Sequence, residues 1–470
     1  MKKLLLLVLM TASLATHAQR LVLKKGVVQD SIQINDSLPE SFALYLPKKF
    51  KTSESWPIVF VFDTGGNAKR ALSLFVPVAE MQGYILAASN NVSDSLSISK
   101  NVLIANRMFN TVITILPIKN GRTYTAGFGS GARLASVMPT FVKGITGVLS
   151  CGSPLANTEV LSPKNPFHFI GIVGDKDFNY PDMLSLEKIL NKLKFPNQLL
   201  VFDGIHEWPS VDNLSKALEY FTLAAMAKGT STASKEIAVV TYNRNLGEVS
   251  SLMSSNKPLL ADHRLSQMIR VYQSFGNGDS LKATQKSLRR SKGYRTQKRA
   301  QNAIFFKENF LKDDFDYYLE EDILTYNYNN LGWWTYQMEK LDEFAKSSNV
   351  FERNMAARLR GYINALIADN VDIIEADDRV DEEALNLLWM LKTITDPKDY
   401  TSYLKIISNN AKVSEYSTAL FYLEELLKQG YTDKEKLYAL EHTSLLRITP
   451  EFNEIVQKYL KEARYDIIEE

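Results

Sequence analysis

The feature that most constrains the fold is the stretch 123–135, which reads TYTAGFGSGARLA. β-favouring residues lead into Gly127, Gly129 and Gly131, and helix-forming residues follow. This pattern predicts a short strand, a cramped turn and the start of a helix. In an elbow of this kind the backbone leaves no room for side chains two places before and after the apex. Gly127 and Gly131 are therefore the small positions, and Gly129 stands at the apex.

Short apolar runs alternate with helical patterns on both sides of the elbow. The unbroken run 58–62 is typical of a strand covered on both faces of a parallel sheet. Further strands are predicted over 21–29, 41–46, 84–88, 147–150, 167–173 and 198–202, and helices over 71–82, 102–116, 183–193 and 213–227. Strands alternating with helices indicate an α/β domain with a mainly parallel sheet and helices on both faces.

The strand pattern stops after residue 228. Residues 229–235 read GTSTASK, a small and polar linker, and apolar residues then recur at helical spacing, for example from Tyr416 to Leu427. A chain of 470 residues with 45% hydrophobic content has room for two or three cores. We therefore expect an α/β domain over 19–228, a linker over 229–235 and an all-α, helical-repeat-like domain over 236–470 without a fixed period.

The first eighteen residues have the design of a cleavable signal peptide. Lys2 and Lys3 precede an apolar run over 4–10, and small residues end before Gln19. The apolar run is too short to span a bilayer, and no cysteine for a lipid anchor follows the cleavage site. We expect a mature chain that is extracytoplasmic, periplasmic or secreted, without a membrane span.

Charge and cysteine content exclude several classes of function. Without Lys2 and Lys3 the chain has 53 basic and 53 acidic residues, so its global charge gives no reason to expect a nucleic-acid or membrane partner. The single cysteine, Cys151, excludes an internal disulfide and a cysteine-based metal site. The basic run 282–299 is typical of a solvated helical face. No cofactor or metal motif is present, and the aromatic pair at 333–334 is predicted to lie in a core.

Three loops after predicted strands carry candidate site residues. Gly65, in the turn 63–67, lets backbone amides face a ligand, as an oxyanion hole requires. Asp175 and Asp177 follow another strand, and either can orient an imidazole. His206 lies in the glycine-flanked loop that follows the next strand. The order of elbow, acid and histidine fits a site derived from a catalytic triad, whereas a loop histidine bonded to backbone is the plainer interpretation. Acidic side chains at 175, 177 and 182 are more typical of solvated loops than of a cation site.

Residues 41–228 resemble the α/β-hydrolase group of polyhydroxybutyrate-depolymerase-like and feruloyl-esterase-like secreted serine esterases. The elbow of that group commonly reads Gly-Phe-Ser-Gly-Gly-Ala-Arg, and residues 127–133 read Gly-Phe-Gly-Ser-Gly-Ala-Arg. The resemblance implies that Asp177 is the acid, His206 the base and Gly65 a neighbour of the oxyanion hole. It also implies that Gly129 occupies the position of the nucleophile.

This departure leaves two interpretations. Glycine has no nucleophilic side chain, and Ser130, one place late, is expected to point into the first turn of the helix. In the first interpretation the protein is a pseudo-hydrolase that binds an ester or glycan-linked small molecule, or a protein partner, through its cleft and helical domain. In the second, the elbow slips to 128–132 and a serine carboxylic-ester hydrolase uses Ser130, His206 and Asp177. Sterics favour the first, because the slip places bulky Phe128 in a slot for a small residue.

Overall fold

The computed structural model describes residues 22–35, 39–159, 161, 166–231, 235–276, 278–461 and 463–465. The signal peptide predicted over 1–18 lies outside these residues. Eight strands form one sheet in the order β1-β2-β4-β3-β5-β6-β7-β8. β2 pairs antiparallel with β1 and β4, and the other neighbours pair in parallel. The strands are β1 (Val28–Gln33), β2 (Ser41–Tyr45), β3 (Trp56–Phe62), β4 (Ile85–Ser89), β5 (Ile118–Phe128), β6 (Ile145–Cys151), β7 (His168–Gly174) and β8 (Asn197–Phe202).

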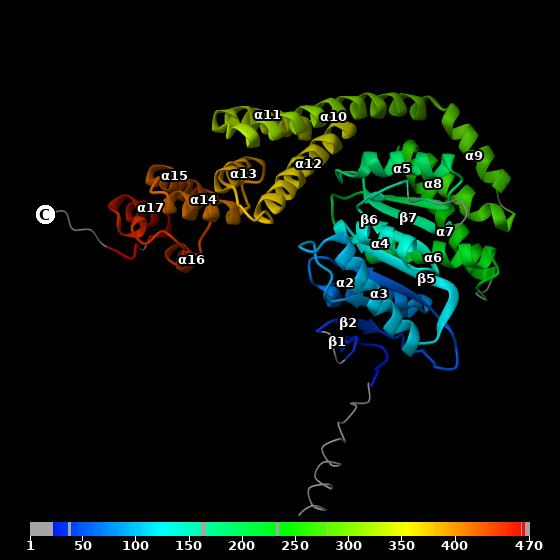
Figure 1. The fold of residues 1–470 in the computed structure, drawn as a ribbon. Helices are drawn as coiled ribbons and strands as arrows, with labels where there is room; N and C mark the ends of the chain where they lie inside the picture. The colour runs from blue at the N-terminus through cyan, green and yellow to red at the C-terminus, as the bar shows by residue number, and fades with distance from the viewer. Residues whose placement is uncertain are drawn as a thin grey trace, which may run out of the picture.

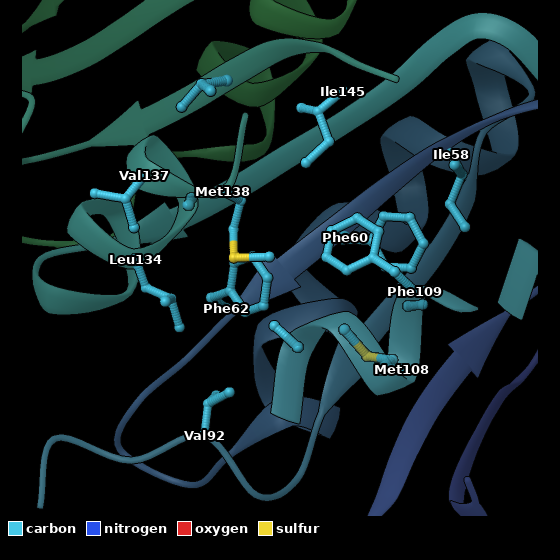
Figure 2. Close-up of a cluster of buried hydrophobic side chains, with 14 of the residues drawn as sticks. Ile58, Phe60, Phe62, Val92, Met108, Phe109, Leu134, Val137, Met138 and Ile145 are labelled. Atoms are coloured by element: carbon cyan, nitrogen blue, oxygen red, sulfur yellow. The ribbon is translucent and has the colours of Figure 1, made fainter. Parts of the chain in front are cut away.

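Helices cover both faces of this sheet, because successive side chains of each buried strand point to opposite sides. Phe60 and Phe62 pack on one face with the helices α3 (Ile98–Ile115), α4 (Ser130–Phe141) and α5 (Tyr180–Lys192). Figure 2 shows this cluster, where the rings of Phe60 and Phe109 lie 3.8 Å apart between centroids. On the other face Val59 and Val61 pack with α2 (Ala68–Gln82) and α6 (Val211–Ala227). The predicted α/β class is confirmed.

The first predicted strand was placed wrongly. It was expected over 21–29, but β1 begins only at Val28. Gly26 has a φ of 76°, in the left-handed region, so the backbone leaves the extended conformation there. Before this bend, Lys25 makes only an isolated bridge to Leu46.

The described residues after 234 form helices and no strand, which confirms the all-α second half. Most helices pack against the next helix in the chain, while α10 packs against α12 and α15 against α17. Figure 1 shows α13 to α17 extending away from the sheet beyond α12. The helices are α7 (Lys235–Ser254), α8 (Pro258–Tyr272), α9 (Gly278–Arg290), α10 (Lys292–Thr325), α11 (Leu331–Ala345), α12 (Val350–Glu375), α13 (Glu382–Thr395), α14 (Tyr400–Lys412), α15 (Tyr416–Lys428), α16 (Lys434–Tyr438) and α17 (Pro450–Leu460), with short 3₁₀ turns at Gln273–Phe275, Tyr328–Asn330 and Leu446–Ile448. Within the described chain, no helix combines the length and apolarity needed to cross a bilayer.

The buried core does not divide at residues 229–235. Apolar side chains of α7, α8 and α9 belong to the same cluster as Val59 and Val61 of β3. The amide of Leu199 on β8 also donates to the Gln267 side chain of α8 at 3.0 Å. Separate clusters begin only further along, one around α10 to α13 and one from α14 to α17. The predicted linker thus separates two sequence patterns, while the core of the α/β domain continues beyond it.

Candidate functional site

The elbow has its apex at Gly129. β5 ends at Phe128, α4 begins at Ser130, and Gly129 between them has φ 55° and ψ −122°. A Cβ atom on Gly127 would lie 2.3 Å from the carbonyl carbon of Gly131, and one on Gly131 would lie 2.3 Å from the carbonyl oxygen of Phe62. Neither position has room for a side chain. The two small positions therefore flank residue 129, as the glycine spacing predicts.

A carboxylate and an imidazole meet beside this apex. Nδ1 of His206 lies 2.9 Å from Oδ2 of Asp177, and Oδ1 of the buried Asp177 accepts the amide of Asn179 at 2.9 Å. The imidazole ring lies 4.6 Å from the ring of Phe128 and 4.5 Å from that of Phe178, between centroids. The side chain of His206 therefore bonds a carboxylate. The plainer interpretation expected it to bond the backbone instead.

The apex faces the free side of this imidazole. A Cβ atom placed on Gly129 would lie 3.6 Å from Nε2 of His206. In a nucleophile–histidine–acid arrangement, Nδ1 bonds the acid while Nε2 takes the proton of the nucleophile. The position from which a nucleophilic oxygen reaches Nε2 is thus position 129, and it carries only hydrogen.

Ser130 has a different partner. Its hydroxyl lies 2.6 Å from that of Thr64, and Ser130 is the first residue of α4. Its backbone N–H is among the first of the helix, which have no acceptor within the helix and are free to bind a ligand oxygen. The amide of Gly65, predicted to neighbour an oxyanion hole, donates to Oδ1 of Asp63 at 3.1 Å. Of the predicted residues, the structure brings together Gly129, Asp177 and His206, and it bonds Ser130 to Thr64.

The second aspartate of the acid loop turns towards the helical half. Oδ2 of Asp175 accepts a hydrogen bond from Nδ2 of Asn354 at 2.9 Å. The backbone carbonyl oxygen of Asp175 accepts another from Nη1 of Arg358 at 2.7 Å. Burial raises the pKa of the Asp175 carboxyl. Nothing in the sequence pointed to Asn354 or Arg358, since both lie within an amphipathic helix far along the chain. Their contact with the acid loop arises only from tertiary packing.

The other residues that the sequence offered as candidates have partners of their own. In the parts of the chain that the structure describes, no group of three or more His, Cys, Asp or Glu side chains is placed to hold a metal ion. Asp182 lies 3.9 Å from Nζ of Lys312. In the basic run 282–299, Arg289 donates to Asp262 at 2.6 Å. Trp334 is buried, with Nε1 2.8 Å from Oδ2 of Asp322, as expected of a core residue.

The fold of the first half is that of an α/β-hydrolase. It has a mostly parallel sheet with helices on both faces, and a strand–turn–helix elbow. An acid and a histidine follow the elbow in chain order and meet beside it. This assignment concerns fold alone, since one fold serves many functions.

No protein-family model matches the sequence, and no curated protein matches it. Among solved structures the chain is similar to Est1E from Butyrivibrio proteoclasticus, at 11% identity over 43% of this chain and 99% of that chain, with a TM-score of 0.34. It is also similar to esterase 2 of Thermogutta terrifontis, at 15% identity over 46% of this chain and 100% of that chain, with a TM-score of 0.35. The S-formylglutathione hydrolase FrmB from Staphylococcus aureus matches at 12% identity over 42% of this chain and 96% of that chain, with a TM-score of 0.33.

Proposed function

We propose that this protein is a non-catalytic α/β-hydrolase-fold protein that binds a ligand in its cleft without turnover. The supporting observation is the elbow apex, where Gly129 faces Nε2 of His206 but has no oxygen to attack a carbonyl. The remaining groups suit binding. His206, held by Asp177, offers a hydrogen-bonding nitrogen, and the first amides of α4 offer donors for a carbonyl oxygen. The ligand is an ester or glycan-linked small molecule, with the helical half available to a protein partner.

The signal-like residues 1–18 support placing this binding protein outside the cytoplasm, in the periplasm or secreted. A serine ester hydrolase using Ser130, His206 and Asp177 is the alternative function. It is less well supported, because the Ser130 hydroxyl bonds Thr64 and stands one residue past the apex that faces the base. To attack, Ser130 would have to leave both Thr64 and its place as the first residue of α4.

Hydrolysis of p-nitrophenyl acetate separates the two functions. We expect no turnover by the wild type above the buffer rate, and no change in Ser130→Ala. Gly129→Ser supplies the missing oxygen beside Nε2 of His206, so we expect it to raise the rate by about 100-fold or more, the usual gain from a positioned proton acceptor. Gly129→Ala is the matched control, because it imposes the same backbone strain, of about 1–3 kcal/mol, without a hydroxyl.

Each outcome of this assay has a distinct meaning, provided that thermal melting shows each variant to be folded. Wild-type turnover that is lost in Ser130→Ala would overturn the proposal and establish Ser130 as a nucleophile. Equal rates in Gly129→Ser and Gly129→Ala would mean that the cleft lacks more than a nucleophile, such as a working oxyanion hole.

A further inference from the structure

A cavity of about 620 Å³ lies at the end of the strands opposite the elbow. Its wall is formed where β3 and β5 begin and by the first half of α7, and its volume is within the range of small-molecule sites. One part of its wall is apolar, formed by Trp56, Pro57, Met81, Ile237 and Val240. Such a wall suits the hydrocarbon part of a ligand.

The polar part of the wall contains a buried cation, Arg122, which is only 4% exposed. Its Nε donates to the hydroxyl of Tyr124 at 2.9 Å, and its Nη2 donates to the hydroxyls of Tyr84 at 2.8 Å and Thr222 at 3.3 Å. These partners are neutral. Among the described residues, no carboxylate pairs with Arg122 and no acceptor bonds its Nη1. A buried charge without a counter-ion is costly, so an anion that reaches Arg122 gains a strong partner.

Three carboxylates, Glu54, Glu219 and Glu236, line the same wall, and none of them pairs with Arg122. Glu219 accepts hydrogen bonds from both terminal nitrogens of the Arg244 guanidinium. Glu54 accepts one from Nζ of Lys51 at 2.7 Å. None of the three replaces an anion at Arg122.

Two other cations, Lys119 and Arg244, line the wall, but both are more exposed than Arg122, and Arg244 is paired with Glu219. Arg122 is therefore the buried cation of this wall, and one such cation beside an apolar wall matches a ligand with one negative charge and an apolar body.

We propose that this cavity binds an organic monocarboxylate, with Arg122 pairing with the carboxylate and Trp56 and its apolar neighbours packing on the hydrocarbon part. The cavity lies at the opposite end of the strands from Gly129 and His206, so binding there does not depend on the function of the site at the elbow.

Isothermal titration calorimetry of the full chain with sodium octanoate, and separately with 1-octanol, tests the proposal. The two probes share an alkyl chain and differ in charge, so we expect octanoate to bind about tenfold or more tightly than octanol. Val240→Glu places a negative charge in the wall and is expected to weaken octanoate binding by about tenfold. Val239→Glu is the matched control: Val239 is similarly exposed on α7, at 58% against 64%, but does not line the cavity, so binding should stay unchanged.

Arg122→Met removes the charge and should abolish the preference for octanoate over octanol, with thermal melting as the check on folding. If that variant does not fold, the Val240→Glu and Val239→Glu pair still decides the matter. Absence of octanoate binding, equal affinity for octanol, or equal weakening by both valine substitutions would overturn the proposal.

Discussion

Among single residues, His168 on β7 links folding to pH. Burial, followed by the charges of Lys228 and Arg270, lowers the pKa of His168 to about 4, although its contact with Gln198 acts in the opposite direction. An unfolded histidine has a pKa of about 6.5. The unfolded chain therefore takes up a proton first as the pH falls, so the stabilisation present above about pH 6.5 is lost progressively towards pH 4.

We expect the free energy of unfolding to fall by about 2–3 kcal/mol between pH 7.5 and pH 4.5 on account of His168, as measured by urea denaturation. His168→Phe should reduce this dependence of the unfolding free energy on pH. His442→Asn, at an exposed histidine, should leave the dependence unchanged. Glu187 contributes little in this window, because most of the stability that depends on it is lost only below about pH 4.5. Burial acts to raise the pKa of Glu187, but His263 and Arg270 hold it at about 2. An unchanged pH dependence in His168→Phe would contradict the account.

At this scale the sequence predicted the apex of the elbow, because glycines two residues apart leave only one position between them for a side chain. The residue pattern alone did not separate Asp175 from Asp177, since both follow the same strand, and only the resemblance to the esterase group pointed to Asp177. The tertiary fold turns Asp177 towards His206 and Asp175 towards Arg358. The hydrogen bond between Ser130 and Thr64 joins the start of α4 to the turn after β3, and no sequence pattern predicted it.

Among elements, helices α10 and α12 hold the loop that carries Asp177. Arg358 on α12 forms a buried bidentate pair with Glu308 on α10, with distances of 2.8 and 2.6 Å, and its third nitrogen donates to the carbonyl of Asp175. Lys312 on α10 donates to the carbonyl of Phe178 at 3.3 Å. Phe178 in turn packs on the His206 ring. The helical half therefore supports the orientation of the acid–histidine pair.

Arg358→Met should lower the free energy of unfolding by about 3–5 kcal/mol, because it leaves Glu308 buried without its partner. It should also shift the imidazole resonances of His206, recorded by long-range ¹H–¹⁵N NMR.

Arg360→Met is the control on the same helix. Its ion-pair partner Asp342 is exposed, and its other contacts are hydrogen bonds to the carbonyls of Met338 and Thr395. The loss should therefore stay below about 2 kcal/mol, and the His206 resonances should not move. Equal shifts in both variants would show that α12 does not position the site.

The strands were predictable because a short unbroken apolar run, such as 58–62, is typical of a strand buried on both faces of a sheet. The packing of α12 on the loop that carries Asp175 and Asp177 could not be predicted in this way. An amphipathic helix shows in its sequence which face is buried, but not what that face is buried against.

In the whole molecule, the α/β core extends through α9. Apolar side chains of α7 to α9 are buried against the same face of the sheet as α2 and α6. The composition of residues 229–235 marked the change from strands to helices. It carried no information on whether the helices that follow pack back on the sheet.

We therefore expect a fragment of residues 19–290 to be monomeric in size-exclusion chromatography and to melt cooperatively by circular dichroism. A fragment of residues 19–231 removes the buried side chains of α7 to α9, among them Leu265, Met268 and Tyr272, and exposes the strand and helix residues beneath them. At roughly 1.5–3 kcal/mol for each large buried side chain, this loss exceeds the reserve of a typical domain. A shorter fragment as stable as the longer one would contradict this expectation and support the domain boundary predicted at 229–235.

The claim that the elbow lacks its nucleophile is tested most directly by covalent labelling. A fluorophosphonate reacts with an activated serine oxygen: an O–P bond forms, fluoride leaves, and the histidine takes the serine proton. After incubation with this reagent and mass spectrometry, we expect no adduct on the wild type or on Gly129→Ala, and one adduct at position 129 in Gly129→Ser. An adduct on Ser130 of the wild type would contradict the account.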